Sequence, residues 1–299
     1  MPQSYSVIDK PSCEASAIND DGTIVGRFGR NRIECEDIEI NKTFLYDGSS
    51  SVEVSGGETS YNTRRDINNL GDTLITLSYD SSKIIIGNGE TINLDFDGYK
   101  INDSRSVVGR NKVYINGTVL SQNPSYYFCG INNNNEAVGF NTSGIYQPII
   151  WKNGITTYLE SFPPSHSGAL AINDNGIVVG YHAIQAAFWG IDHKLNILGD
   201  FTPHSINNKG QIVGDAAGGM RAILYDDGQI IDLNSFLSQN SEWERLAYAY
   251  DINNKGQIVG YGYLKGNDQP YAFLANPIPE PMSLLIFSIG LLVIRKHKK

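Results

Sequence analysis

A nine-residue motif occurs seven times in this 299-residue chain and limits its fold more than any other feature. Its fullest form, at residues 252–260, reads Ile-Asn-Asn-Lys-Gly-Gln-Ile-Val-Gly. The second copy keeps only the first half, and the third and fourth lack the inner glycine. The Ile-Asn pairs begin at residues 18, 67, 101, 131, 172, 206 and 252, so the six steps average 39 residues. Repetition at this period indicates a modular architecture.

Each copy predicts a β-hairpin, because two short β-branched runs flank a polar turn. The inner glycine supplies the positive φ of a tight loop, and the Asn or Asp side chain can bond the backbone two residues on. We expect the final glycine to end the second strand. The final glycines are Gly26, Gly109, Gly139, Gly180, Gly214 and Gly260.

A second pair of strand-like runs follows each hairpin, clearest at residues 43–48, 112–117, 149–154 and 222–228. Four strands in about 40 residues are typical of a β-propeller blade. A β-solenoid is the alternative, but its stacked rungs tolerate unequal periods only as loop insertions. The steps range from 30 to 49 residues, which favours blades.

The chain is therefore predicted to be all-β, with a seven-bladed propeller over residues 1–275. The last unit has a third strand at 271–274 but no fourth, whereas residues 4–9 form an alternating strand with no hairpin before them. We expect this N-terminal strand to complete the last blade and close the ring, which removes two open sheet edges. The alternative is a frayed terminus.

The charge of the chain argues against nucleic acid as a partner. The whole chain carries −9, and its last five residues contribute +4, so residues 1–294 carry −13. Such a body repels phosphate backbones, whose general affinity for proteins comes from basic residues.

The three cysteines give no support for a metal site, and we expect no cofactor. None lies in a Cys-x-x-Cys pair, so zinc binding has no support. Cys13 and Cys35 flank the first hairpin, and a disulfide between them could form in an oxidising compartment; two free thiols are the alternative. Cys129 is expected to be a buried free thiol.

No catalytic motif is present, so we assign no catalytic residue. The five histidines are not paired at metal-ligand spacing, and the chain has neither a Gly-x-Ser-x-Gly elbow nor a phosphate-binding loop. The Asn-Asp-rich turns offer too few carboxylates for calcium. One aromatic residue recurs in most blades, and we favour packing between sheets over sugar stacking for this set. Its members are Tyr46, Tyr114, Trp151, Trp189 and Tyr225.

The composition changes after the last blade. Residues 276–281 are a proline-rich linker, residues 282–294 carry no charge, and a basic cluster ends the chain. A helix of thirteen residues is about 20 Å long against a bilayer core of about 30 Å, so the predicted short apolar helix is a marginal span. Its position between prolines and a basic cluster indicates a sorting signal that associates with the membrane transiently.

Pro279, Glu280 and Pro281, followed by the apolar segment and by Arg295, Lys296, Lys298 and Lys299, resemble the PEP-CTERM sorting signal of Gram-negative bacteria. The resemblance implies export, processing near the motif by an exosortase-type enzyme, and an association with exopolysaccharide and biofilm. Residues 167–180 resemble the HAF repeats of extracellular proteins, with Tyr271 at the place of the histidine in the naming strand. That family implies no activity.

An exported protein needs a leader, and residues 1–5 have neither a basic start nor an apolar core. We therefore expect the annotated start to be too late or the chain to have been trimmed. The function predicted is that of an exported, surface- or matrix-associated, non-enzymatic module that binds or supports extracellular polysaccharide or protein. One alternative is a carbohydrate hydrolase or lyase with carboxylates or histidines at the central channel. Another is a cytoplasmic protein with a fortuitous tail.

Overall fold

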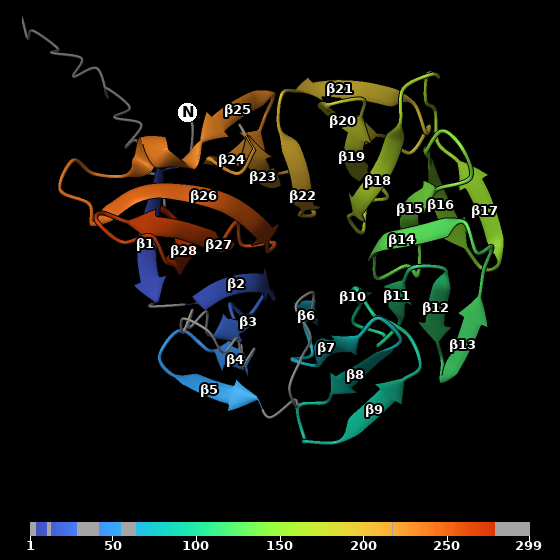
Figure 1. Ribbon diagram of the computed structural model, residues 1–299, viewed down its shortest axis with the longest axis horizontal. Helices are drawn as coiled ribbons and strands as arrows, with labels where there is room; N and C mark the ends of the chain where they lie inside the picture. Colours follow the sequence, from blue (N-terminus) through green and yellow to red (C-terminus); the bar gives the residue numbers. More distant parts are fainter. Residues whose placement is uncertain (1–3, 11–12, 29–41, 55–63, 217, 279–299) are drawn as a thin grey trace, which may run out of the picture.

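The computed structural model describes residues 4–10, 13–28, 42–54, 64–216 and 218–278, which form seven four-stranded antiparallel sheets around a central axis (Figure 1). The prediction of an all-β, seven-bladed β-propeller is confirmed. Within the described residues, the helical content is one 3-10 turn, η1 (Leu233–Phe236). In blades one to six, the strands follow chain order from the axis to the rim.

The first three blades contain β2 (Cys13–Ile18), β3 (Ile24–Phe28), β4 (Lys42–Tyr46) and β5 (Ser51–Val54); β6 (Arg65–Ile67), β7 (Thr73–Ser78), β8 (Ser81–Ile85) and β9 (Thr91–Leu94); and β10 (Lys100–Ile101), β11 (Val107–Gly109), β12 (Lys112–Ile115) and β13 (Thr118–Ser121). The next two contain β14 (Tyr126–Ile131), β15 (Ala137–Asn141), β16 (Gln147–Lys152) and β17 (Ile155–Tyr158); and β18 (Ser167–Ile172), β19 (Val178–His182), β20 (Gln185–Trp189) and β21 (Leu195–Gly199).

Blade six contains β22 (Thr202–Ile206), β23 (Ile212–Ala216), β24 (Arg221–Asp226) and β25 (Gln229–Asp232). The last sheet has the order β1 (Ser4–Lys10), β28 (Pro270–Ile278), β27 (Ile258–Leu264), β26 (Trp243–Ile252). Strand β1 runs antiparallel to β28, in register from Ser4 opposite Ile278 to Lys10 opposite Ala272. Strand β28 also includes residues 276–278, the first half of the predicted linker.

The repeated motif forms the hairpin between the two innermost strands of each blade, as predicted. In blade five, the backbone N–H of Gly176 donates to the carbonyl of Asn173, and that of Asn173 donates to Ile177. The Asn173 side-chain oxygen accepts from the N–H groups of Asn175 and Ile177. Gly176 has φ +78°, the left-handed conformation that glycine adopts without a steric cost.

The expectation that the final glycine ends the second strand was wrong for five of the six copies. Gly180, for example, lies in the middle of β19, and only Gly109 is the last residue of its strand. The reason is a β-bulge in the facing strand, between Ala169 and Ala171. The bulge brings the Gly168 carbonyl against Gly180 so closely that a β-carbon would overlap the oxygen. This glycine permits a close backbone approach.

The hydrophobic core consists of clusters that fill the spaces within and between neighbouring blades. Tyr46, Trp151 and Trp189 are almost fully buried in three of these clusters. Tyr114 and Tyr225 are partly buried and pack against two others. The interpretation of this recurrent aromatic set as packing residues is confirmed.

Several predicted features lie outside the described residues. These are the short C-terminal helix, the sorting motif Pro279, Glu280 and Pro281, the basic residues of the tail, and Cys35; the side chain of Cys13 is also not described. Cys129 is a free cysteine, as expected, but it is only partly buried. No helix among the described residues combines the length and apolar composition needed to cross a membrane.

Candidate functional site

The asparagine of each Ile-Asn pair bonds the next blade. Its Nδ2 donates to the backbone oxygen of the equivalent asparagine, and the seven bonds of 2.9–3.2 Å form a complete ring. The residue after it makes a second ring, in which each backbone N–H donates to the side-chain Oδ1 of its counterpart at 2.8–2.9 Å. The seven asparagines are Asn19, Asn68, Asn102, Asn132, Asn173, Asn207 and Asn253.

These rings use the polar side chains at the first two positions of each turn as hydrogen-bond partners. The turn chemistry predicted from the sequence is present, and the same side chains also connect the blades. The described residues contain no group of three or more His, Cys, Asp or Glu side chains placed to hold a metal. We call the surface that carries the rings the turn face.

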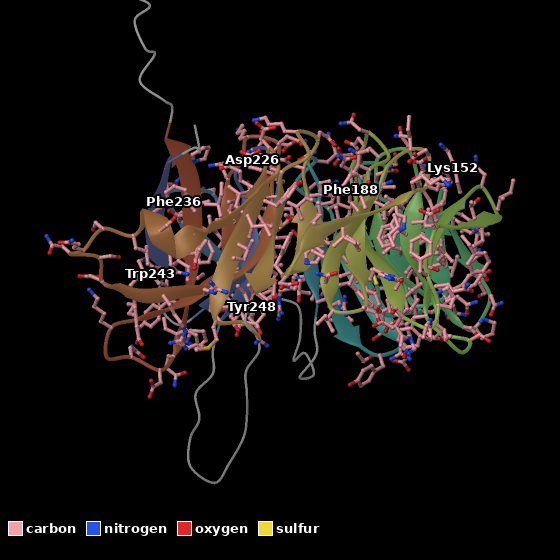
Figure 2. All side chains as sticks on the ribbon, turned by 90° about the horizontal axis from the view of Figure 1, so that it is seen from above. Lys152, Phe188, Asp226, Phe236, Trp243 and Tyr248 are labelled. Atoms are coloured by element: carbon pink, nitrogen blue, oxygen red, sulfur yellow. The ribbon has the colours of Figure 1, made fainter. Side chains whose placement is uncertain are left out.

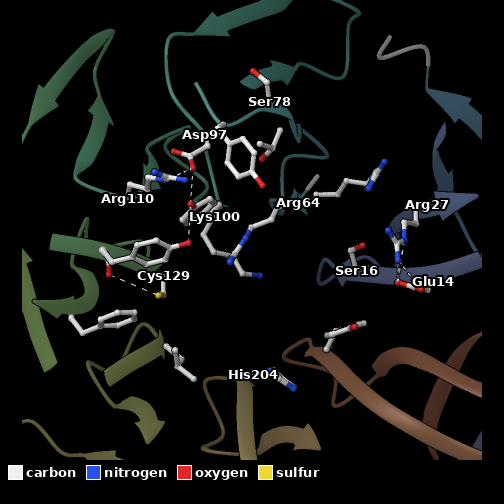
Figure 3. A pocket seen from close by; sticks show the side chains of 18 of the residues that line it. Glu14, Ser16, Arg27, Arg64, Ser78, Asp97, Lys100, Arg110, Cys129 and His204 are labelled. Carbon is white, nitrogen blue, oxygen red and sulfur yellow. Dashed lines mark hydrogen bonds and ion pairs between the residues drawn. The ribbon is translucent and has the colours of Figure 1, made fainter. Parts of the chain in front are cut away.

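At the other end of the innermost strands lies a cavity of about 800 Å³, lined by all seven blades (Figure 3). Tyr248 lies toward this face of the disc, and Lys152 and Asp226 lie toward the turn face (Figure 2). We call the cavity the mouth. In every blade, one lining residue lies two positions before the isoleucine of the Ile-Asn pair, which we call the repeat isoleucine. These seven residues are Ser16, Arg65, Tyr99, Cys129, Leu170, His204 and Tyr250.

The β-bulges explain why this position faces the mouth in five blades. The pairing of β14 with β15 passes from Phe128 to Gly130 and leaves Cys129 without an opposite residue. The same skip occurs at the equivalent residues of four other blades. A bulge re-aims the side chain of its extra residue. In these five blades, the final glycine of the motif admits the bulge and therefore helps to build the mouth.

Five cations and two carboxylates line the mouth, a net charge of +3. Arg27 forms a two-pronged pair with Glu14, with a closest contact of 2.7 Å. Arg110 Nε contacts Asp97 Oδ2 at 2.9 Å, and the Tyr99 hydroxyl donates to the same oxygen at 2.6 Å. These pairs hold both mouth carboxylates in place.

Arg64 and Arg65 are neighbours in sequence with different surroundings. The Arg64 guanidinium lies 4.1 Å from the centre of the Tyr99 ring, and no carboxylate of the described residues lies within ion-pair distance of it. Arg65 is buried and donates through Nε to Thr43 Oγ1 at 2.7 Å. Burial, reinforced by the charge of Arg27, lowers the pKa of Arg65 to about 10.

Two groups of aromatic rings include residues that line the mouth, which are Tyr99, Tyr127 and Phe140 in the first and Tyr250 in the second. The first, the Tyr99 row, is Tyr99, Tyr127, Phe140 and Tyr146, with successive ring centres 5.3–5.4 Å apart. The second, the Tyr250 cluster, is Tyr248, Tyr250 and Tyr261, with centres 5.0–5.8 Å apart. Burial raises the pKa of Tyr99, Tyr250 and Tyr261, so these hydroxyls remain protonated.

Lys100 lines both the mouth and a smaller cavity at the turn face. Lys100 Nζ contacts Asp66 Oδ1 at 2.9 Å, and Asp251 accepts from the Ser205 hydroxyl at 2.6 Å. Each aspartate also accepts the backbone N–H of the repeat isoleucine in the next blade. Burial disfavours charge on Lys100, but the carboxylates of Asp66 and Asp251 outweigh it and raise the pKa of Lys100.

His204 is the mouth histidine with a carboxylate partner, since its Nε2 lies 2.7 Å from Asp215 Oδ1. Its ring centre is 5.7 Å from that of Tyr250. The sequence analysis assigned none of the mouth residues to a functional site, and it named Cys129 only as a buried thiol. A signal was available, because the position two residues before the isoleucine differs in nearly every blade while the motif beside it is repeated.

No protein family model matches the chain, and none of the curated proteins matches it. Solved structures do. YCF48 bound to D1 peptide aligns at a TM-score of 0.62 and 11% identity, over 93% of this chain and 96% of that chain. The β-propeller domain of the Trilobed protease from Pyrococcus furiosus gives 0.55 and 13%, over 77% and 85%.

A third structure, PorZ, a surface component of the type-IX secretion system of Porphyromonas gingivalis, gives a TM-score of 0.54 at 9% identity. That alignment covers 92% of this chain and 39% of PorZ. At these identities, the three likenesses show the β-propeller fold alone.

Proposed function

We propose that this protein is an exported, surface- or matrix-associated, non-enzymatic β-propeller that binds extracellular polysaccharide in its mouth. The observation that carries the proposal is the mouth itself, a cavity of about 800 Å³ lined by seven blades, charged groups and tyrosines. Small-molecule sites are typically concave cavities of about 300–1,000 Å³ with aromatic walls and a few polar groups.

The residues of the mouth favour a sugar over a folded protein as its ligand. Sugars present C–H faces that pack on aromatic rings and hydroxyls that bond charged side chains. Tyr99, Tyr127, Phe140 and Tyr250 supply rings in the lining. Arg64 and the Arg110–Asp97 pair supply polar groups. A large protein partner would instead require a broad exposed surface.

A variant that fills the mouth with a larger side chain tests the binding role. Leu170→Trp places a larger side chain at a lining position, and Ile155→Trp makes the same change on the outermost strand of blade four, where the side chain is 71% exposed. Binding of the native extracellular polysaccharide, measured by calorimetry, should be lost in Leu170→Trp and kept in Ile155→Trp, with both variants folded by circular dichroism. Unchanged binding in Leu170→Trp would place the ligand elsewhere.

Export and sorting rest on the tail. Pro279, Glu280 and Pro281, the uncharged residues 282–294 and the terminal basic cluster occur in the order of a PEP-CTERM signal, which supports processing by an exosortase-type enzyme. Intact mass and fractionation of the native protein test this, beside a variant with all three motif residues changed to Ala. A full-length cytoplasmic protein in both cases would refute the sorting proposal.

We extend the proposal to ring closure by the N-terminal strand. The antiparallel register of β1 with β28 supports it, as do the hydrogen bonds of the last blade to the first at the turn face. A strand contributed by the opposite chain end holds the first and last parts of the propeller in one sheet. A closed ring keeps all seven walls of the mouth in fixed positions.

A carbohydrate lyase or hydrolase is the second candidate, favoured by one arrangement. His204 is paired with Asp215 and lies beside Tyr250 in the mouth, and histidine and tyrosine can act as general acid and base. Incubation with acidic and neutral polysaccharides, followed by assays for new reducing ends and for unsaturated products, tests it. Turnover that His204→Gln abolishes would replace the binding role with catalysis.

A further inference from the structure

Resting on the proposed function, we propose that the polysaccharide bound in the mouth is acidic and that Arg64 binds the carboxylate of one of its uronic acid units. The charge of the mouth is opposite to that of the protein. Residues 1–294 carry −13, whereas the lining of the mouth carries +3. A basic cavity in an acidic protein selects for a negatively charged ligand.

The ion pairs show where this positive charge is available. Glu14 compensates Arg27, Asp97 compensates Arg110, and Asp66 compensates Lys100. Arg64 has no carboxylate partner among the described residues, and it is exposed in the mouth. Arg65 is buried and donates to Thr43 Oγ1, so Arg64 is the exposed cation of the mouth that can accept an anion without breaking an ion pair that the structure shows.

The position of Arg64 suits a carboxylate. The Arg64 guanidinium carbon lies over the Tyr99 ring, 4.1 Å from its centre, and a guanidinium carries its N–H donors along the edge of its plane. Arginine binds carboxylates through two parallel hydrogen bonds from such an edge. Figure 3 shows Arg64 in the mouth, between Arg110 on the left and Arg27 on the right.

The aromatic rings next to Arg64 make this a sugar site and not a site for a bare anion. Tyr127 contacts Tyr99 through its hydroxyl at 2.9 Å, and Phe140 stacks on Tyr127 with ring centres 5.3 Å apart. A uronate bound through its carboxylate to Arg64 could place its C–H face against this row. Inorganic anions would gain nothing from these rings.

The cavities at the two faces differ in charge, which gives the ligand a direction of approach. Five aspartates line the smaller cavity at the turn face, together with Lys100, which also lines the mouth; without this shared lysine the mouth carries +2 and the turn-face cavity −5. The aspartates are Asp20, Asp66, Asp103, Asp174 and Asp251. Fixed charges of opposite sign at the two ends steer an anion to the mouth and repel it from the turn face.

The test compares oligogalacturonate with a neutral galactan oligosaccharide of the same length, by calorimetry on the full chain. The wild type should bind the oligogalacturonate at least tenfold more tightly, and Arg64→Gln should weaken that binding by about tenfold to hundredfold. The effect should decrease with added salt. Arg221→Gln is the control, because Arg221 does not line the mouth. Its side chain is 54% exposed, and it lies 3.9 Å from the carboxylate of Asp232.

The outcomes separate this inference from the proposed function. Equal binding of the acidic and neutral oligosaccharides, blocked by Leu170→Trp but not changed by Arg64→Gln, would overturn the inference and leave polysaccharide binding in place. Absence of binding to either sugar and to the native polysaccharide would overturn both. Sodium sulfate that binds as tightly as oligogalacturonate would show a simple anion site, and would also overturn the inference.

Discussion

The Nδ2 atom of Asn253 donates to the backbone oxygen of Asn19 at 2.9 Å, across 234 residues of sequence. The same side chain accepts from the N–H groups of Lys255 and Gln257 through Oδ1. One amide group therefore shapes its own hairpin and connects the last blade to the first. This double role explains why an asparagine occupies the second position of all seven copies of the motif.

Asn253→Ala should lower the free energy of unfolding by about 2–4 kcal/mol, because it removes several buried hydrogen bonds at about 0.5–1.5 kcal/mol each. Chemical denaturation followed by tryptophan fluorescence measures the change. Asn196→Ala is the control: Asn196 is exposed and donates to one backbone oxygen two residues away, so its loss should cost less than about 0.5 kcal/mol. Equal effects at the two positions would contradict the connecting role.

Gly180→Ala should destabilise the protein by about 3 kcal/mol or more, because the new β-carbon would overlap the Gly168 carbonyl and force the bulge apart. Gly87→Ala is the matched control, since nothing lies within 4 Å of a β-carbon built there. Thermal unfolding of both variants gives the comparison. A Gly180→Ala protein as stable as the control would mean that the bulge does not require glycine.

Trp189→Ala should cost about 3–5 kcal/mol, as expected for a fully buried aromatic residue. Trp189 is 0% exposed, and its Nε1 donates to the Glu160 backbone oxygen at 2.7 Å. Ile191→Ala, at a side chain 79% exposed, should change the stability by less than about 0.5 kcal/mol. If Trp189 were a sugar platform, its variant would lose binding and keep its stability.

The seven blades could be predicted from the sequence because their signal is local and repeated. An Ile-Asn pair, a turn glycine and two β-branched runs specify a hairpin wherever they occur, and their period indicates the propeller. Trp151 and Trp189 were interpreted correctly as packing residues for the same reason. Features that every blade shares reveal what the blades need in order to stack.

The mouth could not be predicted because its residues come together only after the ring has formed. Arg64 in blade two and Tyr99 in blade three are in contact, yet no motif relates them. The bulge that directs Cys129 toward the mouth depends on the carbonyl of Tyr127 packing against Gly139. The sequence shows this glycine, but not the strand that approaches it. The variable position beside the motif was the available signal.

Cys129 should react slowly with iodoacetamide in the folded protein. Burial raises the pKa of its thiol to about 12, so at pH 8 the folded chain holds roughly a thousandfold less thiolate than an unfolded thiol with the ordinary pKa near 9. Mass spectrometry of the Cys129 peptide, with and without denaturant, measures the two rates. Equal rates in both states would contradict the raised pKa.

The raised pKa of the Cys129 thiol also determines how the stability of the protein should change with pH. A folded-state pKa above the unfolded value stabilises the protein while the thiol stays protonated. The contribution of Cys129 is therefore fully present below about pH 9 and is lost as the pH rises toward 12. Cys129→Ala should reduce the loss of stability over that interval, in denaturation measured at several pH values.

Deletion of residues 1–10 tests closure by β1. The deletion removes seven paired positions opposite β28 and exposes the edge of that strand, so stability should fall by about 0.5–1.5 kcal/mol for each lost ladder hydrogen bond. An unpaired edge also favours association, which analytical ultracentrifugation would detect. Deletion of residues 282–299, outside the propeller blades, is the control for truncation itself.

A synthetic peptide of residues 1–10 provides the reciprocal test of this closure. If β1 completes the last blade, the free strand should add to the edge of β28 in the shortened protein, as peptides add to open sheet edges elsewhere. It should restore both the stability and the monomeric state, and a peptide with Val7→Pro should not, because proline cannot donate to the ladder. A shortened protein as stable as the full chain, with no response to the peptide, would show that the ring is held by blade contacts such as Asn253 to Asn19 alone.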